Sequence, residues 1–190
     1  MYLINASLKN IKTITLLLIC FISFNAFAND VPDFLKNQKG YAEEGHVWAQ
    51  YNLGVMYNNG KGVIQDHKQA VKWYRKAAEQ GYATAQFNLA LMYDNGKGVI
   101  QDHKQAFKWY RKAAEQGYAD AQYNLAHMYD NGQGVIQSSN NSYIWNTIAA
   151  ANGHENAIYN RDLVAKNLSP RGLEEAQKEA AKLYEKINNK

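Results

Sequence analysis

Histidine is the residue type in this chain best suited to ligate a metal or to act as a general base. His67 and His103 are copies of one position in a repeated segment, 36 residues apart. Neighbouring helical units are spaced by about 10 Å, whereas zinc ligands lie about 2 Å from the metal. Two histidines on successive units therefore cannot share one ion, and we expect no metal site.

The other candidates for catalysis lack the partners that a reaction needs. His127 and His154 have no carboxylate or nucleophile at a known motif spacing, and no Gly-x-Ser-x-Gly or His-Glu-x-x-His segment occurs. The Gly-Lys-Gly turns at 60–62 and 96–98 lack the remaining residues of a phosphate-binding loop. We therefore predict a protein that is not an enzyme, with no catalytic, metal-binding or cofactor-binding residues and no cofactor.

Residues 1–28 have the features of a cleavable secretory signal peptide. A weakly basic start precedes an apolar run from Thr13 to Phe24 and the small-x-small triplet that ends at Ala28. The run has roughly twelve residues, whereas a stable membrane span needs about twenty. We expect cleavage after Ala28, a periplasmic or secreted protein and no stable membrane span. Cleavage would also remove Cys20, the single cysteine.

The charge balance gives little indication of a partner. The formal net charge is +4, and it falls to +2 without Lys9 and Lys12, which belong to the leader. A nearly balanced secreted chain is a poor candidate for binding nucleic acid. We expect none to bind.

The rest of the chain is dominated by an internal repeat. At a shift of 36 residues, segment 45–80 matches segment 81–116 at 28 of 36 positions. A third copy, 117–152, keeps 17 of its first 21 residues and then diverges. A fixed period of this length is typical of stacked repeat architectures.

Each copy has the pattern of a first helix followed by a turn. Ala49, Leu53, Met56 and Tyr57 recur at i, i+4, i+7 and i+8, which places them on one helical face. The segment 58–62 follows with two glycines, which permit a positive φ. The pattern therefore predicts a helix that ends in a tight turn.

A second helix follows in each copy. Asp66 and Gln69 have the spacing of a capping box at its start, and Gly81 is suited to the left-handed position past its end. We expect one side of this helix to be buried, with Trp73, Trp109 and Trp145 filling the space between helix pairs. In the first copy the buried side comprises Ala70, Trp73, Tyr74, Ala77 and Ala78.

One such helix pair cannot cover its own apolar face, so the copies must stack into a shared core. We therefore predict an all-α solenoid of helix-turn-helix repeats with a 36-residue period. The expected organisation is a signal peptide at 1–28, an N-terminal capping helix at 29–44, repeats at 45–80, 81–116 and 117–152, and a degenerate repeat with a C-terminal capping helix at 153–190.

These segments resemble Sel1-like repeats, which belong to the tetratricopeptide-like superfamily. The resemblance rests on the run 49–57, the Gly-Lys-Gly-Val turn at 60–63, and Trp73-Tyr74 followed by the Ala-Ala-Glu-Gln-Gly segment 77–81. It implies a right-handed superhelix that acts as a scaffold or adaptor in protein–protein interaction. Some cysteine-rich relatives are associated with β-lactams, which leaves a cell-wall-directed binder or hydrolase as the alternative function. This chain lacks their paired cysteines.

The C-terminal region departs from the repeat. Ser169 and Pro170 are typical of a helix start and predict a helix to about Ile187. Ile144 and Ile148 replace the lysines found in the earlier copies and need a cover. We expect the final helix to fold back on them through Leu173, Ala176, Ala180 and Leu183. The alternative is that these isoleucines form a partner surface.

Positions that vary between copies on one side of the first helix are candidates for recognition. In a tetratricopeptide-like superhelix this side lines a concave groove, so the resemblance implies aromatic residues on the groove floor and acidic residues along one margin. Such a groove suits a protein or peptide partner with apolar anchors and some positive charge. The alternative is that the aromatic rings only pack between neighbouring first helices. The candidate partner-binding residues are Trp48, Tyr51, Val55, Asn58, Thr84, Phe87, Leu91, Asp94, Asp120, Tyr123, His127 and Asp130.

The second helices carry a basic ridge on their outer side. It comprises Lys68, Lys72, Arg75 and Lys76 and their copies 36 residues later. We interpret these residues as solvated, with contact to anionic lipid or polymer as the alternative. The constant Asn52, Asn88 and Asn124 are expected to bond backbone groups of a neighbouring loop or helix. We expect the protein to be monomeric.

Overall fold

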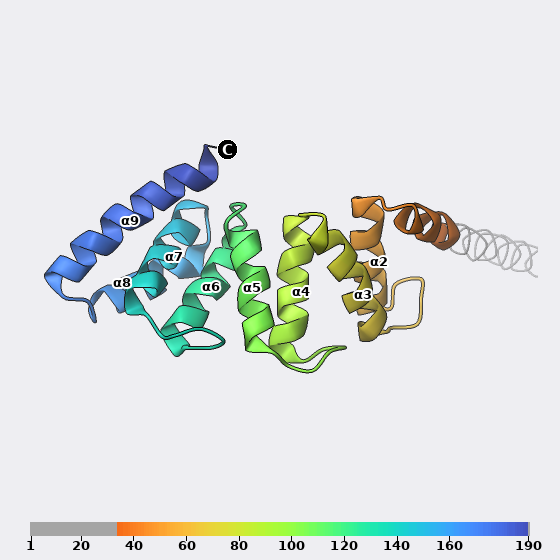
Figure 1. The fold of residues 1–190 in the computed structure, drawn as a ribbon, viewed down its shortest axis with the longest axis horizontal. Helices are drawn as coiled ribbons and strands as arrows, with labels where there is room; N and C mark the ends of the chain where they lie inside the picture. The colour runs from red at the N-terminus through yellow and green to blue at the C-terminus, as the bar shows by residue number, and fades with distance from the viewer. Residues whose placement is uncertain (1–33, 190) are drawn as a thin grey trace, which may run out of the picture.

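The computed structural model describes residues 34–189, and the regular secondary structure within this range is entirely helical (Figure 1). A helical segment at 34–43 is followed by paired antiparallel helices, which confirms the predicted all-α solenoid. The predicted signal peptide lies outside the described residues. The helices are α2 (Val47–Asn59), α3 (His67–Glu79), α4 (Ala83–Asn95), α5 (His103–Ala114), α6 (Ala119–Asn131), α7 (Ser139–Ala151), α8 (Glu155–Ala165) and α9 (Pro170–Asn188).

The turn inside each unit depends on glycine. Gly60 ends α2 in the left-handed region with φ of 69°, as the Asn-Asn-Gly-Lys-Gly segment predicts. Gly98, in the next turn, has φ of 70° and lies against the start of α3. A Cβ atom at Gly98 would lie 2.3 Å from the His67 carbonyl oxygen. Successive units therefore approach each other through bare backbone at this position.

The second helices begin at side-chain caps. Asp66 accepts hydrogen bonds from the backbone N–H groups of Lys68 and Gln69 at 2.9 and 3.1 Å, and Asp102 and Ser138 cap α5 and α7 in the same way. The predicted capping box is only half formed, because the Asp66 N–H donates to the Tyr57 carbonyl at 2.9 Å. That bond ties the cap to the end of the first helix.

The core is continuous from one unit to the next. The predicted leucines Leu53, Leu89 and Leu125 are fully buried, and the three repeat tryptophans are buried between neighbouring helices. Small alanines line the contacts, so the helices approach closely. The predicted buried side of the second helix is confirmed in full for α3.

A ladder of buried amides joins successive units. Gln86 in α4 donates to the Ala78 carbonyl at the end of α3 at 3.0 Å, and its side-chain oxygen accepts from Gln116 at 2.7 Å. Gln50 and Gln122 make the equivalent bonds to the Ala42 and Ala114 carbonyls. Helix ends leave carbonyls without intrahelical partners, so each glutamine satisfies one such group of the preceding unit.

The N-terminal segment is a lone second helix, as predicted. Ala42 is fully buried and its carbonyl takes the place of Ala78 in the amide ladder. Leu35 packs on the cluster that this segment forms with α2 and Trp73 of α3. The segment 34–43 therefore covers the first face of the stack.

The final helix covers the other end. Ser169 accepts from the Gly172 N–H at 3.1 Å and Pro170 occupies the first turn of α9, as predicted. Ile144 and Ile148 of α7 are buried, together with Ala176 and Ala180 of α9. Figure 1 shows α9 lying across the stack beside α7. The interpretation of the two isoleucines as a partner surface is therefore wrong, because α9 occupies it.

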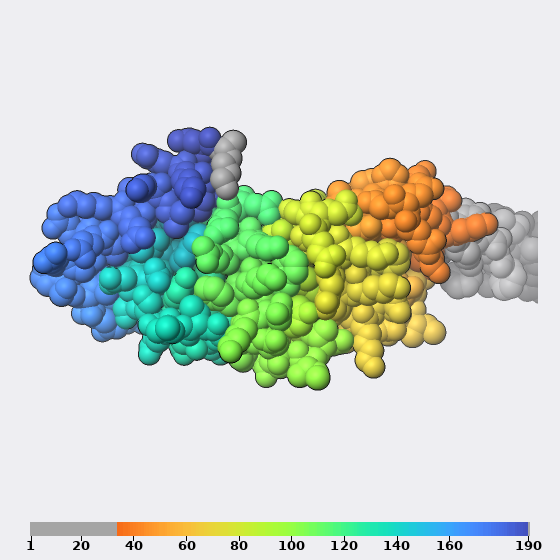
Figure 2. Space-filling view, viewed as in Figure 1, coloured from red at the N-terminus to blue at the C-terminus, as the bar shows by residue number. Residues whose placement is uncertain are grey.

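The stack is elongated, as the space-filling view in Figure 2 shows. Among residues 34–189, no helix combines the length and the apolar character needed to cross a bilayer.

Candidate binding surface

The stripe, defined as the twelve candidate residues on the first helices, follows α2, α4 and α6 in order. Its members range from half-buried to exposed: Trp48 is 44% exposed, while Tyr51, Phe87 and Tyr123 are half-buried. The stripe is therefore accessible to a ligand, although its aromatic rings are also engaged in packing.

The aromatic rings of the stripe bridge successive units. The Tyr51 ring lies 5.1 Å from the ring of Tyr82, the N-cap residue of α4, and 6.0 Å from Tyr74. Phe87 contacts Tyr118, the N-cap residue of α6, at 5.0 Å. These contacts are the packing between first helices that we gave as the alternative. One side of each ring supports the stack, and the exposed part of each ring faces solvent.

Buried tyrosines lie beneath these rings. Burial raises the pKa of the Tyr74 phenol above its ordinary value, and a hydrogen bond with Asn88 of the next unit opposes the rise. Burial raises the pKa of Tyr110 in the same way. The expectation that the constant asparagines bond backbone groups stays a prediction.

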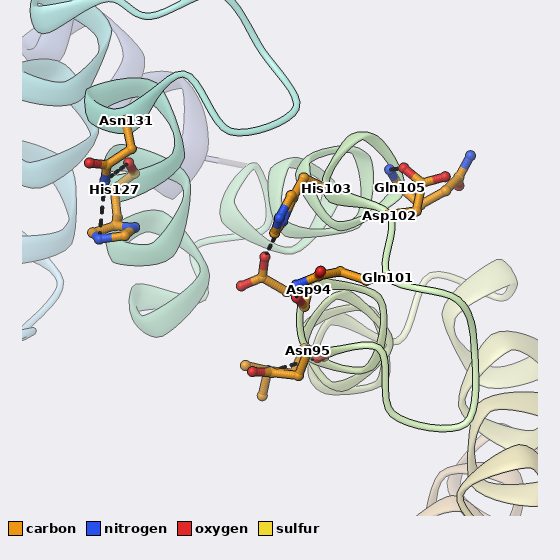
Figure 3. Close-up of polar contacts among 9 residues, drawn as sticks. Asp94, Asn95, Gln101, Asp102, His103, Gln105, His127 and Asn131 are labelled. Carbon is orange, nitrogen blue, oxygen red and sulfur yellow. Dashed lines mark hydrogen bonds and ion pairs between the residues drawn. The ribbon is translucent and has the colours of Figure 1, made fainter.

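Figure 3 shows the acidic residue of the stripe on α4 bonded to a histidine. The Asp94 carboxylate lies 2.8 Å from Nδ1 of His103, the first residue of α5. Both side chains are about one-third exposed. In the same figure His127 on α6 pairs with Asn131, one turn further along the helix, at 3.1 Å. Sequence spacing did not indicate either contact.

A second histidine joins the stripe where it approaches α8. The His154 ring stacks on Tyr123, with centroids 4.1 Å apart and planes 14° apart. Its Nε2 lies 3.7 Å from the Asp120 carboxylate, and its Nδ1 is buried without a hydrogen-bond partner. Asn160 donates to the Tyr123 hydroxyl at 3.2 Å. Two stripe residues, Asp120 and Tyr123, thereby meet at the joint between α6 and α8.

The structure also brings stripe residues from different helices around one hollow. A hollow of about 230 Å³ lies between the ends of α2 and α4, with Asn58 and Leu91 of the stripe on its walls. Tyr74 and Met92 add apolar surface, and three polar side chains complete it: Asn88, Asn95 and Lys97. This hollow can receive a small side chain of a ligand.

The stripe continues one unit further than the sequence analysis took it. Tyr159 and Leu163 of α8 stand 36 residues after Tyr123 and His127, and they are 72% and 49% exposed. Within the described residues α9 follows α8 in place of another repeat, so Tyr159 has no N-cap ring of a next unit beside it and remains largely in solvent. The same 36-residue shift that defined the stripe would have found both residues.

The cations of the basic ridge are exposed, as expected, and several of them also contact aromatic side chains. The Lys76 and Lys72 amines lie over the Trp73 ring at 4.6 and 5.6 Å, and Lys112 and Lys108 lie over Trp109 in the same way. Arg75 donates to the Tyr93 hydroxyl at 2.6 Å. The cations of the ridge therefore cover the edges of the core aromatics while they remain exposed.

Within 34–189, no group of three or more histidine, cysteine or carboxylate side chains is placed to hold a metal ion. Within the same residues, neither the Asp94–His103 pair nor the Asp120–His154 pair is hydrogen-bonded to a serine or cysteine side chain.

Comparison with known proteins agrees with the internal repeat. The Sel1 repeat family matches residues 49–82, 83–118 and 119–154, which together exceed half of the chain. The chain belongs to the Sel1 repeat family. Sel1 repeats generally serve as scaffolds for protein–protein interaction and are typically not enzymes.

Two solved structures share more than 30% identity with this Sel1 repeat protein. A Sel1 repeat protein from Oxalobacter formigenes is 34% identical with a TM-score of 0.63, over 70% of this chain and 58% of that one. The c5321 protein, a protective antigen of uropathogenic Escherichia coli with an SLR fold, is 31% identical with a TM-score of 0.64, over 82% of this chain and 41% of that one. The chain thus spans about half the length of these relatives.

A more distant structure shares the fold. The Helicobacter pylori cysteine rich protein B is 19% identical with a TM-score of 0.54, over 68% of this chain and 92% of that one. A search of curated proteins finds no match.

Proposed function

We propose that this Sel1 repeat protein is a secreted or periplasmic, non-enzymatic scaffold that binds a segment of another protein along the stripe. The observation that carries the proposal is the contrast between a repeated core and a varied accessible surface. Gln50, Gln86 and Gln122 are identical and buried at every joint, whereas the stripe changes from Trp48 to Thr84 to Asp120 at one position. A surface that varies over a constant frame is free to encode recognition.

The chemistry of the stripe suits a partner with apolar anchors and positive charge. Half-buried rings and the hollow beside Leu91 can accept apolar side chains, and rigid aromatic surface is typical of binding hot spots. Asp94, Asp120 and Asp130 place three carboxylates on the stripe without a lysine or arginine among its twelve members. Acidic surface attracts basic partner segments and raises association rates.

The proposal is tested by capture of partners from the cell-envelope fraction by crosslinking. Substitutions at Tyr51 or Tyr123 would disturb the stack, so exposed stripe positions are preferable: Asp130→Lys combined with His127→Glu. The control variant is Glu179→Lys on α9, which also reverses an exposed charge. We expect the stripe variant to lose captured proteins that the control retains. Equal capture by both variants would contradict the proposal.

The location is tested separately. We expect N-terminal sequencing of protein recovered from the periplasm or the medium to begin at Asn29, the residue after the proposed cleavage site. Retention of residues 1–28 on the recovered protein would contradict a cleaved signal.

The non-enzymatic part of the proposal is tested with nitrocefin and with peptidoglycan. We expect no turnover of either substrate. Turnover that a point substitution abolishes without unfolding the chain would favour the cell-wall-directed alternative.

A further inference from the structure

The turns between paired helices display the most exposed large apolar side chains of the described chain. Ile64, Ile100 and Ile136 are 91%, 91% and 88% exposed, and they occupy one position at the 36-residue period. By comparison, the most exposed aromatic residue among the large apolar side chains, Tyr159, is 72% exposed. A β-branched aliphatic side chain held in water at every unit is unfavourable unless something covers it.

The backbone around each isoleucine is fixed. Gln65, the next residue, donates to the Asn58 carbonyl at 2.7 Å, and the Asp66 N–H donates to the Tyr57 carbonyl. Gln101 and Gln137 close the second and third turns at 2.7 and 2.6 Å. The isoleucines are therefore presented outward by a closed turn whose two ends are hydrogen-bonded.

The three turns share one edge of the stack. Gly98 of the second turn lies against His67 at the start of α3, and Gly134 of the third turn lies against His103 at the start of α5. The second and third turns thus each lie against the start of the preceding second helix. Figure 1 shows the turns α2–α3, α4–α5 and α6–α7 along the lower side of the molecule. We call this surface the turn edge and define it by Ile64, Ile100 and Ile136.

Positive charge flanks the first two turns of the turn edge, whereas the third turn, around Ile136, carries no lysine or arginine. Lys61 and Lys68 stand on either side of Ile64, and Lys97 and Lys104 stand on either side of Ile100, all four exposed. Asp66 and Asp102 reduce the excess to one positive charge in each of these turns.

The groove beside the first turn has the same balance. It encloses about 840 Å³ and is lined by Ile64, three lysines and two carboxylates: Lys39, Lys72 and Lys76 with Glu43 and Asp66. The exposed isoleucines of the first two turns therefore lie in net positive surroundings.

We propose that the turn edge is a peripheral membrane contact, in which the three isoleucines enter the interface of a bilayer that contains anionic lipids. Proteins are held at such an interface by the burial of apolar area and by electrostatic attraction to anionic headgroups. Lysines close to the membrane surface strengthen the electrostatic attraction. The repeated isoleucine favours a bilayer over a protein partner. A lipid bilayer presents the same chemistry at every point along its surface. The turn edge repeats one side chain in every unit and therefore suits such a surface, whereas the stripe varies from unit to unit.

The test must separate turn insertion from binding by the apolar residues of the leader. We place an environment-sensitive fluorophore on a single cysteine in the full chain, using Cys20→Ser with Ile100→Cys. The matched control places the same fluorophore at the exposed end of the stack, using Cys20→Ser with Ile158→Cys. Vesicles of phosphatidylglycerol and phosphatidylcholine are compared with vesicles of phosphatidylcholine alone.

With anionic vesicles we expect a blue shift of the fluorophore at position 100, and quenching by brominated lipid, without either change at position 158. Substituting Lys61, Lys68, Lys97 and Lys104 with glutamine should lower the inserted fraction, by about fivefold for each lysine that contacts the headgroups. Substituting Ile64 and Ile136 with serine should lower it as well.

Three results would overturn the proposal. The first is an unshifted fluorophore at position 100 on chains that float with the vesicles, since the leader alone would then hold them. The second is an equal shift on phosphatidylcholine alone, because the charge term would be absent. The third is a shift that needs no vesicles and grows with protein concentration, because the turn edge would then contact a second copy of the chain. None of these results bears on the stripe, which is a separate surface.

Discussion

At the scale of single residues, the joints between units depend on buried amides. Gln86 accepts from Gln116 and donates to the Ala78 carbonyl, so one side chain satisfies groups from both neighbouring second helices. A buried polar group that loses its partner costs about 1–3 kcal/mol. The position therefore has no apolar substitute that leaves its neighbours satisfied.

We accordingly expect Gln86→Leu to lower the free energy of unfolding by about 1–3 kcal/mol, because the buried Ala78 carbonyl loses its partner. Urea denaturation followed by circular dichroism measures the change. Gln177→Leu, on an exposed position of α9, is the matched control and should leave the midpoint nearly unchanged. Equal midpoints for the two variants would contradict a structural role of the ladder.

The buried tyrosines predict a loss of stability at alkaline pH. Burial raises the pKa of the Tyr110 phenol in the folded chain, so above pH about 10 the unfolded chain binds fewer protons than the folded one. The free energy of unfolding must then fall as pH rises, by up to about 1.4 kcal/mol per pH unit for each such phenol. Tyr110→Phe should flatten the fall between pH 9 and 11, as measured by chemical denaturation. Tyr159→Phe, at an exposed ring, serves as the control and should not flatten it.

The sequence was sufficient to identify individual packing residues but not their polar partners. The core leucines and tryptophans follow from helical spacing, because burial depends on the position of a residue on its own helix. The partners of Gln86 lie 8 and 30 residues away and include a backbone carbonyl, which no side-chain pattern records. The same limit applies to His154 and Asp120, 34 residues apart, which meet only because α6 and α8 are stacked.

At the scale of elements, the turn glycines differ in what they permit. Gly81 and Gly98 both have positive φ, at 92° and 70°, but only Gly98 has backbone in the place of a Cβ atom. A non-glycine residue in the left-handed region costs about 1–2 kcal/mol. Because a Cβ atom at Gly98 would also collide with the His67 backbone, position 98 should tolerate a side chain far less well than position 81.

We expect Gly81→Ala to cost about 1–2 kcal/mol and Gly98→Ala to cost clearly more, because the turn must also move away from α3. Thermal melts of the two variants test the difference. Similar melting temperatures would indicate that the turn can shift without loss of packing.

The final helix was predictable because it had to cover a defined surface. Ile144 and Ile148 break the lysine pattern of the earlier units, and the apolar spacing of α9 matches them. The exposed Tyr159 of α8 was not anticipated, since it depends on the absence of a following unit rather than on its own spacing.

Ala180 and Ala181 provide a matched pair for the role of α9. Ala180 is buried and Ala181 is exposed, so we expect Ala180→Asp to displace α9 and raise binding of an apolar dye, whereas Ala181→Asp should not. The reason is that an unpaired carboxylate is strongly disfavoured in an apolar contact. Unchanged dye fluorescence in both variants would mean that Ile144 and Ile148 remain covered without α9.

At the scale of the whole molecule, each unit is stabilised by the apolar contacts that it makes with its neighbours in the shared core. Trp109 of α5 is buried within the core cluster that extends to α9. Emptying such a site costs about 3–5 kcal/mol. Because each repeat unit is held by its neighbours, the loss affects the whole array.

We therefore expect Trp109→Ala to lower the melting temperature of the entire chain in calorimetry, whereas Trp48→Ala, at a ring 44% exposed, should have a much smaller effect. A melting temperature unchanged by Trp109→Ala would mean that this tryptophan does not support the stack.

The interchangeable joints have a consequence for how such a molecule can evolve. Each unit offers its successor a helix-end carbonyl, to which the glutamine of the successor donates while it accepts from the terminal amide of its own unit. An additional copy of 81–116 would therefore meet the same chemistry on either side. Among the described helices, α9 makes extensive contact only with α7. It would therefore still cover the end of a lengthened array. Duplication of a repeat can therefore change the length of the array in steps of one unit, while point substitutions independently alter what the protein recognises.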